Sequence, residues 1–279
     1  MNSLYIDLFG GRDEKDKLAN VLDGVIENIQ ISAVSEVLKN KEGSGDPEGG
    51  SIEYKRFANA TLQDKGTARA SKEGTALKSK PVIVNLNDDK EIIEEIQTKD
   101  LKLYGIAGMA EKRMQNFTKR VIAYLDKSFF AKAVAVGTAY TGTSTNAQDI
   151  IDDMIVTAKS TESDFIDGID SEDLAIVLSN RYRKELKNAL DELPNGTDAT
   201  NGIIGMYDGI EVFETHRLPK GTNAIVMLKG SIAQPYFISE YDLEKIPLDD
   251  SFALQTFLYT GVEALAEEAI IYDKDVTSL

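Results

Sequence analysis

The stretch Thr98–Ala135 most constrains what this chain can fold into, because it predicts one very long amphipathic helix. Apolar side chains recur in it every three or four residues, which places them on one side of a helix with 3.6 residues per turn. These residues are Leu103, Ile106, Ala110, Met114, Phe117, Val121, Leu125 and Phe129. At about 1.5 Å per residue the helix would span roughly 55 Å, well beyond a typical helix of about 11 to 12 residues. We therefore expect a spine on which the rest of the chain is built.

The same stretch also predicts a polar face and a helix start. The polar side consists of Lys112, Gln115, Asn116, Lys119 and Asp126, with Arg113 and Arg120 on its flank. Thr98 supplies the predicted cap and Asp100 a first-turn acid for the helix dipole. Gly105 and Gly108 are expected to loosen the first turns, because glycine costs roughly 1 kcal/mol relative to alanine inside a helix. A core helix of an ordinary domain is the alternative interpretation.

Length and composition limit the class of protein. With 279 residues, 42% of them hydrophobic, the chain can form one large domain or two smaller ones. Cysteine is absent, which excludes disulfides, thiolate nucleophiles and zinc–thiolate sites. The N-terminus has no signal-peptide pattern and no long apolar run occurs, so we expect a soluble protein of a reducing cytoplasm with no membrane partner. The net charge of −16 argues against a protein that grips nucleic-acid phosphates tightly.

The charge is unevenly distributed along the chain. Residues 51–80 carry seven basic side chains against three acids, a net charge of +4, so the remainder carries −20. The basic residues are Lys55, Arg56, Lys65, Arg69, Lys72, Lys78 and Lys80. A basic segment on an acidic protein tends to bind an acidic surface, either on its own body or on another copy of the chain. A solvated charged loop is the alternative.

Around this basic segment the pattern predicts an arm and a protruding hairpin. Lys17–Lys39 is predicted as a second amphipathic helix, and the glycine-rich Asn40–Gly50 as a flexible connection. Ser51–Phe57 and Pro81–Leu86 have strand patterns, and the polar segment between them has little to bury. Structureless loops beyond roughly 12 to 15 residues are uncommon inside compact domains. We therefore expect a long hairpin that a partner orders.

The rest of the chain mixes helices and strands. Asp88–Gln97 is predicted to be extended, and Ala147–Thr157 to form a helix capped by Asn146. Asp173–Ser179 has the continuous apolar pattern of a buried strand and leads at once into a helix, Asn180–Leu193. This step suggests an α/β or α+β layer. Further strands are predicted at 202–214, 224–230, 236–240, 252–259 and 265–272.

Residues suited to catalysis or ligand binding are scarce. The single histidine, His216, lies in a predicted turn, which argues against active sites that depend on a histidine imidazole. Acids cluster at Asp149, Asp152 and Asp153, and again at Asp164, Asp167, Asp170, Glu172 and Asp173. They could hold Ca²⁺ or Mg²⁺, but their spacing does not match an EF-hand, and helix caps and a solvated acidic loop explain them more simply. No phosphate-binding glycine motif occurs, so we predict no catalytic residue, metal site or cofactor.

Order and composition together resemble the major capsid proteins of tailed bacteriophages with the HK97-type fold. Three stretches carry the resemblance: SIEYKRFANATLQDKGTARASKEGTALKSKPVIVNL as the extended loop, LYGIAGMAEKRMQNFTKRVIAYLDKSFFAKAV as the spine helix, and GIIGMYDGIEVFETHRLPKGTNAIVMLKGSIA in the axial domain. The resemblance implies an α+β fold with an N-terminal arm, an extended β-hairpin loop, a spine helix, and peripheral and axial domains. The implied boundaries are 1–50 for the arm, 51–86 for the loop, 87–143 with 237–279 for the peripheral domain, and 144–236 for the axial domain.

The resemblance also implies partners and a location. Copies would form the pentamers and hexamers of an icosahedral shell around loosely packaged double-stranded DNA, with a separate scaffolding protein and a portal protein. The seven basic residues of the loop would then contact a neighbouring subunit. The implied location is the virion, after assembly in the host bacterial cytoplasm. Two alternatives stay open: an encapsulin-like compartment shell, and a metal-dependent hydrolase that uses the acids between Asp164 and Asp173.

Overall fold

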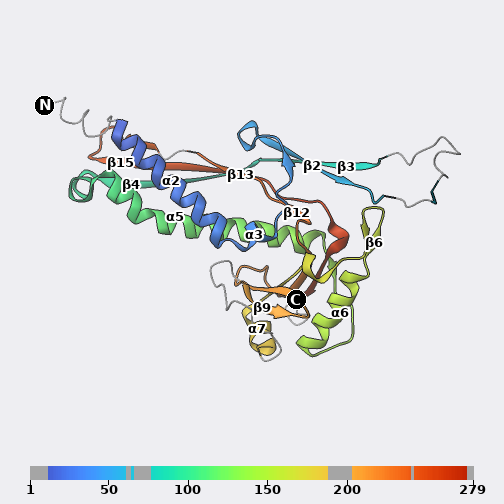
Figure 1. Ribbon diagram of the computed structural model, residues 1–279. Helices are drawn as coiled ribbons and strands as arrows, with labels where there is room; N and C mark the ends of the chain where they lie inside the picture. The colour runs from blue at the N-terminus through green and yellow to red at the C-terminus, as the bar shows by residue number, and fades with distance from the viewer. Residues whose placement is uncertain (1–11, 61–63, 66–76, 188–202, 240–241, 275–279) are drawn as a thin grey trace.

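The computed structural model describes residues 12–60, 64–65, 77–187, 203–239 and 242–274. Figure 1 shows an elongated upper layer, in which helices α2 and α5 run beside long strands, and a second group of strands and helices below it. The β2–β3 hairpin extends to one side of the upper layer. The predicted α+β class is confirmed, because one sheet is antiparallel and the other combines parallel and antiparallel pairs.

The predicted spine is helix α5, Thr98–Val136, with 39 residues. Its stripe is buried from Phe117 onward, at Phe117, Val121, Leu125 and Phe129. Gly105 has φ 72° and ψ 168°, which breaks the helical backbone as the glycine pattern predicted. This kink shifts the phase of the first turns, so the prediction that Leu103 is buried was wrong: it is 70% exposed.

Two further predictions about α5 were wrong. The N-cap position is Gln97, with no side-chain cap, and the Thr98 hydroxyl instead donates to the carbonyl oxygen of Asp250 at 3.0 Å. Asp126, placed on the solvated face by helical periodicity, is fully buried. Both side chains are taken up by segments distant in sequence, which a helical pattern does not reveal.

The N-terminal helix lies along the spine. It comprises α2, Arg12–Ser32, and α3, Val34–Leu38, and is interrupted at Ala33, which has extended backbone angles. Leu22, Val25 and Ile29 are buried against α5 and the long sheet. The predicted continuous helix Lys17–Lys39 is therefore two helices. Because of the interruption, α3 and α2 contribute their apolar side chains to two different hydrophobic clusters.

A long antiparallel sheet covers one side of α5 and α2. Its central strand is β15, Ser251–Thr260, which pairs along its whole length with β4, Asp88–Gln97. On its other edge β15 pairs with β13, Tyr236–Ile238, and β14, Asp242–Lys245. Side chains alternate between the two faces of a strand, so Ile92 and Ile96 face the helices while Ile93 faces outward.

The hairpin forms a three-stranded sheet with the segment that precedes it. Strand β2, Ser51–Phe57, pairs antiparallel with β3, Ser79–Asn85, and with β1, Gly43–Ser44. The short 3₁₀ helix η1, Pro47–Gly49, follows β1. The prediction of a flexible connection at 40–50 was therefore wrong, because backbone hydrogen bonds hold this segment, including Asn40 N to Ile232 O at 2.8 Å.

The second sheet has six strands in the order β5-β17-β11-β8-β10-β9. They are β5 Thr138–Ala139, β8 Leu174–Leu178, β9 Ile203–Tyr207, β10 Ile210–Glu214, β11 Thr222–Leu228 and β17 Ile270–Lys274. Helices α6, Ala147–Lys159, and α7, Asn180–Leu186, pack on it, and Asn146 caps α6 as predicted. Small elements complete the fold: β6 Glu162–Ser163, β7 Ile166–Asp167, η2 Ser171–Asp173, β12 Ile232–Ala233, β16 Glu263–Ala264 and η4 Glu267–Ala269.

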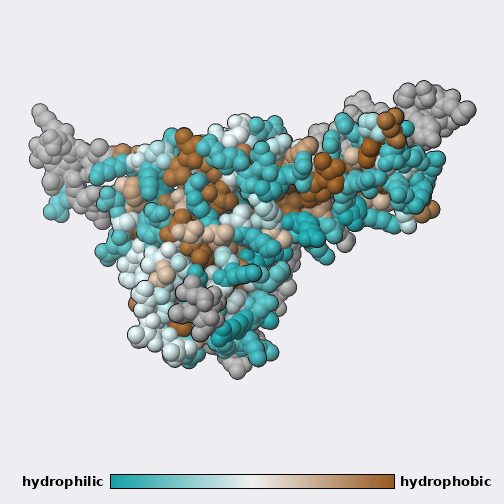
Figure 2. Space-filling model, turned by 180° about the vertical axis from the view of Figure 1, so that it is seen from behind, coloured by the Kyte–Doolittle hydropathy of each residue, from teal (hydrophilic) through white to brown (hydrophobic). Residues whose placement is uncertain are grey.

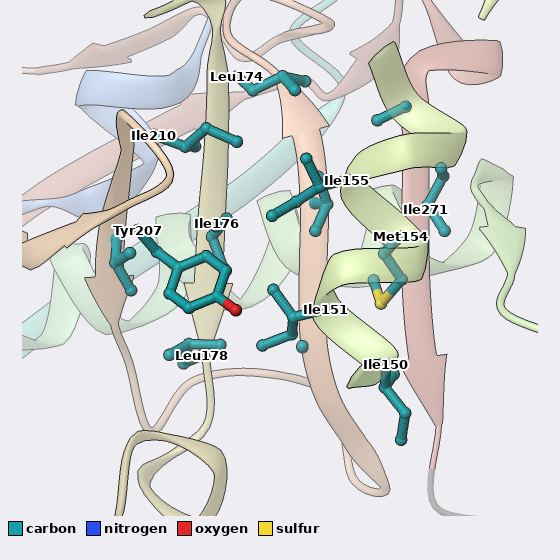
Figure 3. Packing of buried hydrophobic residues seen from close by; sticks show 14 of the residues in the cluster. Ile150, Ile151, Met154, Ile155, Leu174, Ile176, Leu178, Tyr207, Ile210 and Ile271 are labelled. Atoms are coloured by element: carbon teal, nitrogen blue, oxygen red, sulfur yellow. The ribbon is translucent and has the colours of Figure 1, made fainter. Parts of the chain in front are cut away.

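The fully buried strand β8 divides the core into two layers. Leu174, Ile176 and Leu178 pack with α6 in one cluster, shown in Figure 3, whereas Ala175 and Val177 pack with α5 and α3 on the opposite face. Figure 3 shows Ile151, Ile155 and Met154 of α6 directed toward these strands. A strand covered on both faces has the continuous apolar pattern that the sequence displayed.

The last strand belongs to the six-stranded sheet. The predicted strand at 265–272 is interrupted by η4, and only β17 continues, pairing antiparallel with β11. The segment 237–279 therefore supplies β13, β14 and β15 to the long sheet and β17 to the six-stranded sheet.

Candidate assembly surfaces

The base of the hairpin is packed on its own subunit. Ile52 and Tyr54 of β2 and Val84 of β3 are buried against Ala233 and Leu265. The alternate side chains point away from the subunit, as the two-residue period of a strand requires. Two apolar side chains on this outward face are exposed, Phe57 (55% of its surface) and Ile83 (60%), and so is Leu77 (74%), which lies just before β3. The hairpin thus presents apolar side chains to solvent without a partner among the described residues.

Arg56, one of the seven predicted contact residues, binds within its own subunit. Its Nη1 donates to the carbonyl oxygen of Leu265 at 2.6 Å, and its Nη2 to Glu268 Oε1 at 3.0 Å. Its guanidinium also lies 5.0 Å from the ring centroid of Phe165. Burial tends to raise the pKa of Glu268, but hydrogen bonds from its own backbone amide and from Arg56 outweigh this and lower the pKa. Arg56 therefore anchors the hairpin base.

The other predicted contact residues are exposed where the structure describes them. Lys55 lies 3.4 Å from Glu53 in a solvent-exposed ion pair, which contributes little to stability. Lys65, Lys78 and Lys80 are exposed. Arg69 and Lys72 lie outside the described residues. Lys55 lies on the outward face with Phe57 and Ile83, whereas Lys80, the cross-strand partner of Arg56, lies on the face of the hairpin that carries Arg56.

The outer face of the long sheet is acidic. The odd-numbered residues of β4 point away from the helices, and Asp89, Glu91 and Glu95 are exposed there, as is Glu244 of β14. Ile93, 54% exposed, lies among them. On β15 the half-buried Gln255, Phe257 and Tyr259 face the same way. Figure 2 shows such mixed surface on the back of the molecule, where apolar patches are interspersed with hydrophilic side chains.

This acidic face was missed by the sequence analysis, although the signal is present. In DDKEIIEEIQ the acids at 89, 91 and 95 share one parity, with Ile93 among them. Once the segment is assigned as a strand, that alternation places one apolar and three acidic side chains on a single face. The Glu268 acceptor of Arg56 carries no such signal, because it lies 212 residues away in sequence.

Two of the clustered acids, Asp152 and Asp153 of α6, accept hydrogen bonds from residues outside that helix. Tyr207 donates to Asp152 Oδ1 at 2.6 Å, and burial together with this carboxylate raises the pKa of Tyr207 to about 12. Tyr140 and Ser144 donate to Asp153, which lowers the pKa of Asp153. In the described part of the chain no three His, Asp or Glu side chains gather as a metal site. His216 is exposed.

Among the helices that the structure describes, none is long and apolar enough to cross a lipid bilayer.

A scan against protein-family models and a search of curated proteins found no match. Solved structures do match. The head structure of Helicobacter pylori bacteriophage KHP40 aligns with a TM-score of 0.59 at 10% identity, over 87% of this chain and 90% of that chain. A structure of Mycobacterium phage Che8 aligns with a TM-score of 0.58 at 13% identity, again over 87% and 90%. A virus-like particle from Pyrococcus furiosus aligns with a TM-score of 0.53 at 10% identity, over 93% and 98%.

These similarities extend over nearly the whole chain. Because the identities are only 10 to 13%, they establish the fold alone. The chain has the HK97-type fold of the capsid proteins of tailed bacteriophages.

Proposed function

We propose that this protein is the major capsid protein of a tailed bacteriophage. Copies assemble into the pentamers and hexamers of an icosahedral shell that encloses double-stranded DNA. The observation that carries the proposal is that the chain follows subunits of a phage head and a phage capsid over 87% and 88% of its length. Shells of this kind need no catalytic site, in keeping with a protein that is not an enzyme.

The domain division follows the same proposal. Residues 1–50 form the N-terminal arm and 51–86 the extended loop. Residues 87–143 with 237–279 form the peripheral domain, and 144–236 the axial domain, except that β17 is grouped with the axial sheet because it pairs with β11. The axial domains meet at the centre of each capsomer, where contacts must close by symmetry.

In the shell, the extended loop docks on a neighbouring copy. The exposed lysines of the loop and its apolar side chains Phe57, Leu77 and Ile83 need a partner that is both acidic and partly apolar. The outer face of the long sheet has this character, with Asp89, Glu91 and Glu95 around Ile93. Complementary charge steers the encounter and fixes the register, while burial of the apolar side chains supplies affinity.

Within this docking the seven basic residues have two roles. Arg56 holds the hairpin base on its own subunit, through Leu265 and Glu268. Lys55, Lys65, Lys78 and Lys80, with Arg69 and Lys72 farther along the loop, contact the neighbour. Each contact is weak, since exposed ion pairs contribute about 0.2 to 1 kcal/mol, and the shell gains its strength from their number.

Other partners follow from the same function. A separate scaffolding protein sets the curvature of the growing shell, and a portal protein occupies one vertex. The packaged DNA is held loosely, because the protein carries a net charge of −16. The protein is assembled in the cytoplasm of the bacterial host and resides in the virion.

Electron microscopy of the purified full chain, alone and with candidate scaffold, tests the proposal. Closed shells or capsomers are the expected result, and a persistent small monomer under all conditions would contradict it. The absorbance of particles isolated from cells tests the contents: nucleic acid supports a viral head, whereas an enzyme cargo without nucleic acid supports a compartment shell. As a control against a metal-dependent hydrolase, Asp167→Asn combined with Asp170→Asn should leave assembly unchanged.

A further inference from the structure

The exposed face of α5 carries a row of cations. Phe117, Val121 and Leu125 are buried against α2 and the long sheet, so the opposite side of the helix is exposed. At the edge of this side, Asn116 and Arg120 line a pocket with Glu94 and Leu254 of the long sheet. Between residues 112 and 127, the exposed side chains that the structure describes are Lys112, Asn116, Lys119, Arg120 and Lys127. At 1.5 Å per residue the row is about 22 Å long. We call Lys112, Lys119, Arg120 and Lys127 the spine stripe.

In the described part of the chain no acid is paired with the spine stripe: Glu94, which lines the same pocket as Arg120, is paired with Arg113. None of its four side chains forms an ion pair with another described residue. Lys112 lies over the ring of Tyr104, 3.4 Å from its centroid, which leaves its charge intact. Asp126 adjoins Lys127 in sequence, but its carboxylate is buried and paired with Arg217. On a protein with a net charge of −16, this face is therefore locally basic.

The composition of the spine stripe favours a phosphate backbone as its partner. A protein-docking patch is built around buried apolar or aromatic side chains, and the exposed side chains of this row include none. Contact with the DNA backbone needs cations and hydrogen-bond donors, which the four cations and the Asn116 amide supply. Duplex DNA presents one charge per about 1.7 Å of its axis, so a straight row of this length meets several phosphates.

We propose that the spine stripe is the surface through which this subunit contacts the phosphates of packaged duplex DNA, with the exposed face of α5 turned toward the interior of the shell. The inference rests on the proposed capsid function. Four cations on an acidic protein give a contact that is weak and sensitive to salt, so the DNA is positioned along the wall and still free to move.

Fluorescence anisotropy of a short labelled duplex, titrated with the unassembled full chain, tests this assignment. For four phosphate contacts, affinity should fall by about 10²-fold between 50 and 200 mM salt, because each contact adds about −0.9 to the logarithmic slope. The variant K112Q/K119Q/R120Q/K127Q should lose most of this dependence and bind at least tenfold more weakly at the lower salt. The matched variant K41Q/K184Q/K220Q/K245Q removes four exposed charges that lie outside both the stripe and the hairpin, and it should bind as the wild type does.

Thermal melting of both variants checks that they fold, and electron microscopy checks shell formation separately. The inference is overturned if the wild type does not bind duplex at low salt, or if the two variants lose affinity equally. It is also overturned if polyglutamate of matched charge binds the stripe more tightly than DNA, which would point to an acidic protein segment. Loss of DNA binding by the stripe variant with intact shells supports the inference, whereas absence of wild-type shells counts against the capsid function instead.

Discussion

Arg217 and Asp126 form an ion pair across 91 residues of sequence, with 2.6 Å between Arg217 Nη1 and Asp126 Oδ2. The other carboxylate oxygen accepts the backbone N–H of Ser35 at 3.0 Å. The Asp126 side chain is fully buried, and that of Arg217 is 18% exposed. One carboxylate of α5 thus connects α3 of the N-terminal segment with the turn that follows β10, and so holds the two layers of the subunit together.

Replacing this carboxylate should destabilise the subunit strongly. Asp126→Asn keeps an oxygen for Ser35 but leaves the Arg217 charge largely buried and unpaired, a change that typically costs about 3 to 5 kcal/mol. Urea unfolding of the unassembled protein measures the loss. Lys127→Gln, at the exposed neighbouring position, is the control and should stay within about 0.5 kcal/mol of wild type. If Asp126→Asn lowers the free energy of unfolding by less than about 1 kcal/mol, the ion pair does not hold the two layers together.

The kink in α5 predicts opposite effects at its two glycines. Gly105→Ala should destabilise by about 1 to 3 kcal/mol, because φ 72° with ψ 168° is a conformation that essentially only glycine adopts. Gly108→Ala should stabilise by up to about 1 kcal/mol, because an added Cβ would lie 3.8 Å from Tyr104 Cβ, an ordinary contact. Denaturant unfolding measures both. Equal effects would mean that the helix is straight in solution.

The Arg56–Glu268 pair predicts a dependence on acid. The pKa of Glu268 is lowered below its ordinary value near 4.5, so the ionised form stabilises the fold above that pH, and this contribution is lost as pH falls through the lower folded pKa. Glu268→Gln should therefore lower the melting temperature at neutral pH, and the gap to wild type should close as the pH falls below the ordinary glutamate pKa. A gap that stays constant with pH would exclude the ion pair as its cause.

The end of β17 is tied to α7 by a buried hydrogen bond. Tyr182 donates to Asp273 Oδ2 at 2.7 Å, and Asn223 donates to the same oxygen at 3.0 Å. Tyr182→Phe should cost about 1 to 3 kcal/mol, because the buried Asp273 loses one of two side-chain donors. Burial and the carboxylate raise the pKa of Tyr182, so the advantage of wild type should shrink as pH rises above about 10. Calorimetry of both proteins at neutral and alkaline pH checks this.

Local sequence patterns correctly predicted those helices and strands whose side chains follow a regular period along the chain. The strands at Ser51–Phe57 and Asp88–Gln97, and the helix from Thr98, occur as their alternation or helical period indicated. The Asn146 cap of α6 was also predicted, because capping depends on neighbours within one turn.

The misses share a physical cause, contacts between distant segments. Asp126 was assigned to solvent because its partners Ser35 and Arg217 are each 91 residues away. Arg56 was grouped with the exposed lysines because Glu268 is 212 residues away. β17 crosses to the six-stranded sheet, and nothing in its apolar pattern specifies which sheet it joins.

The central claim is that the basic hairpin of one copy docks on the acidic sheet face of another. Charge reversal with rescue, with shells counted by electron microscopy after matched assembly reactions, tests it most directly. Lys55→Glu with Lys78→Glu, and separately Glu91→Lys with Glu95→Lys, should each reduce shell yield at least tenfold because like charges then face each other. All four substitutions in one chain should restore shells, since the charges are again complementary. Full assembly by either charge-reversed pair, or no recovery in the combined variant although it folds, would contradict the account.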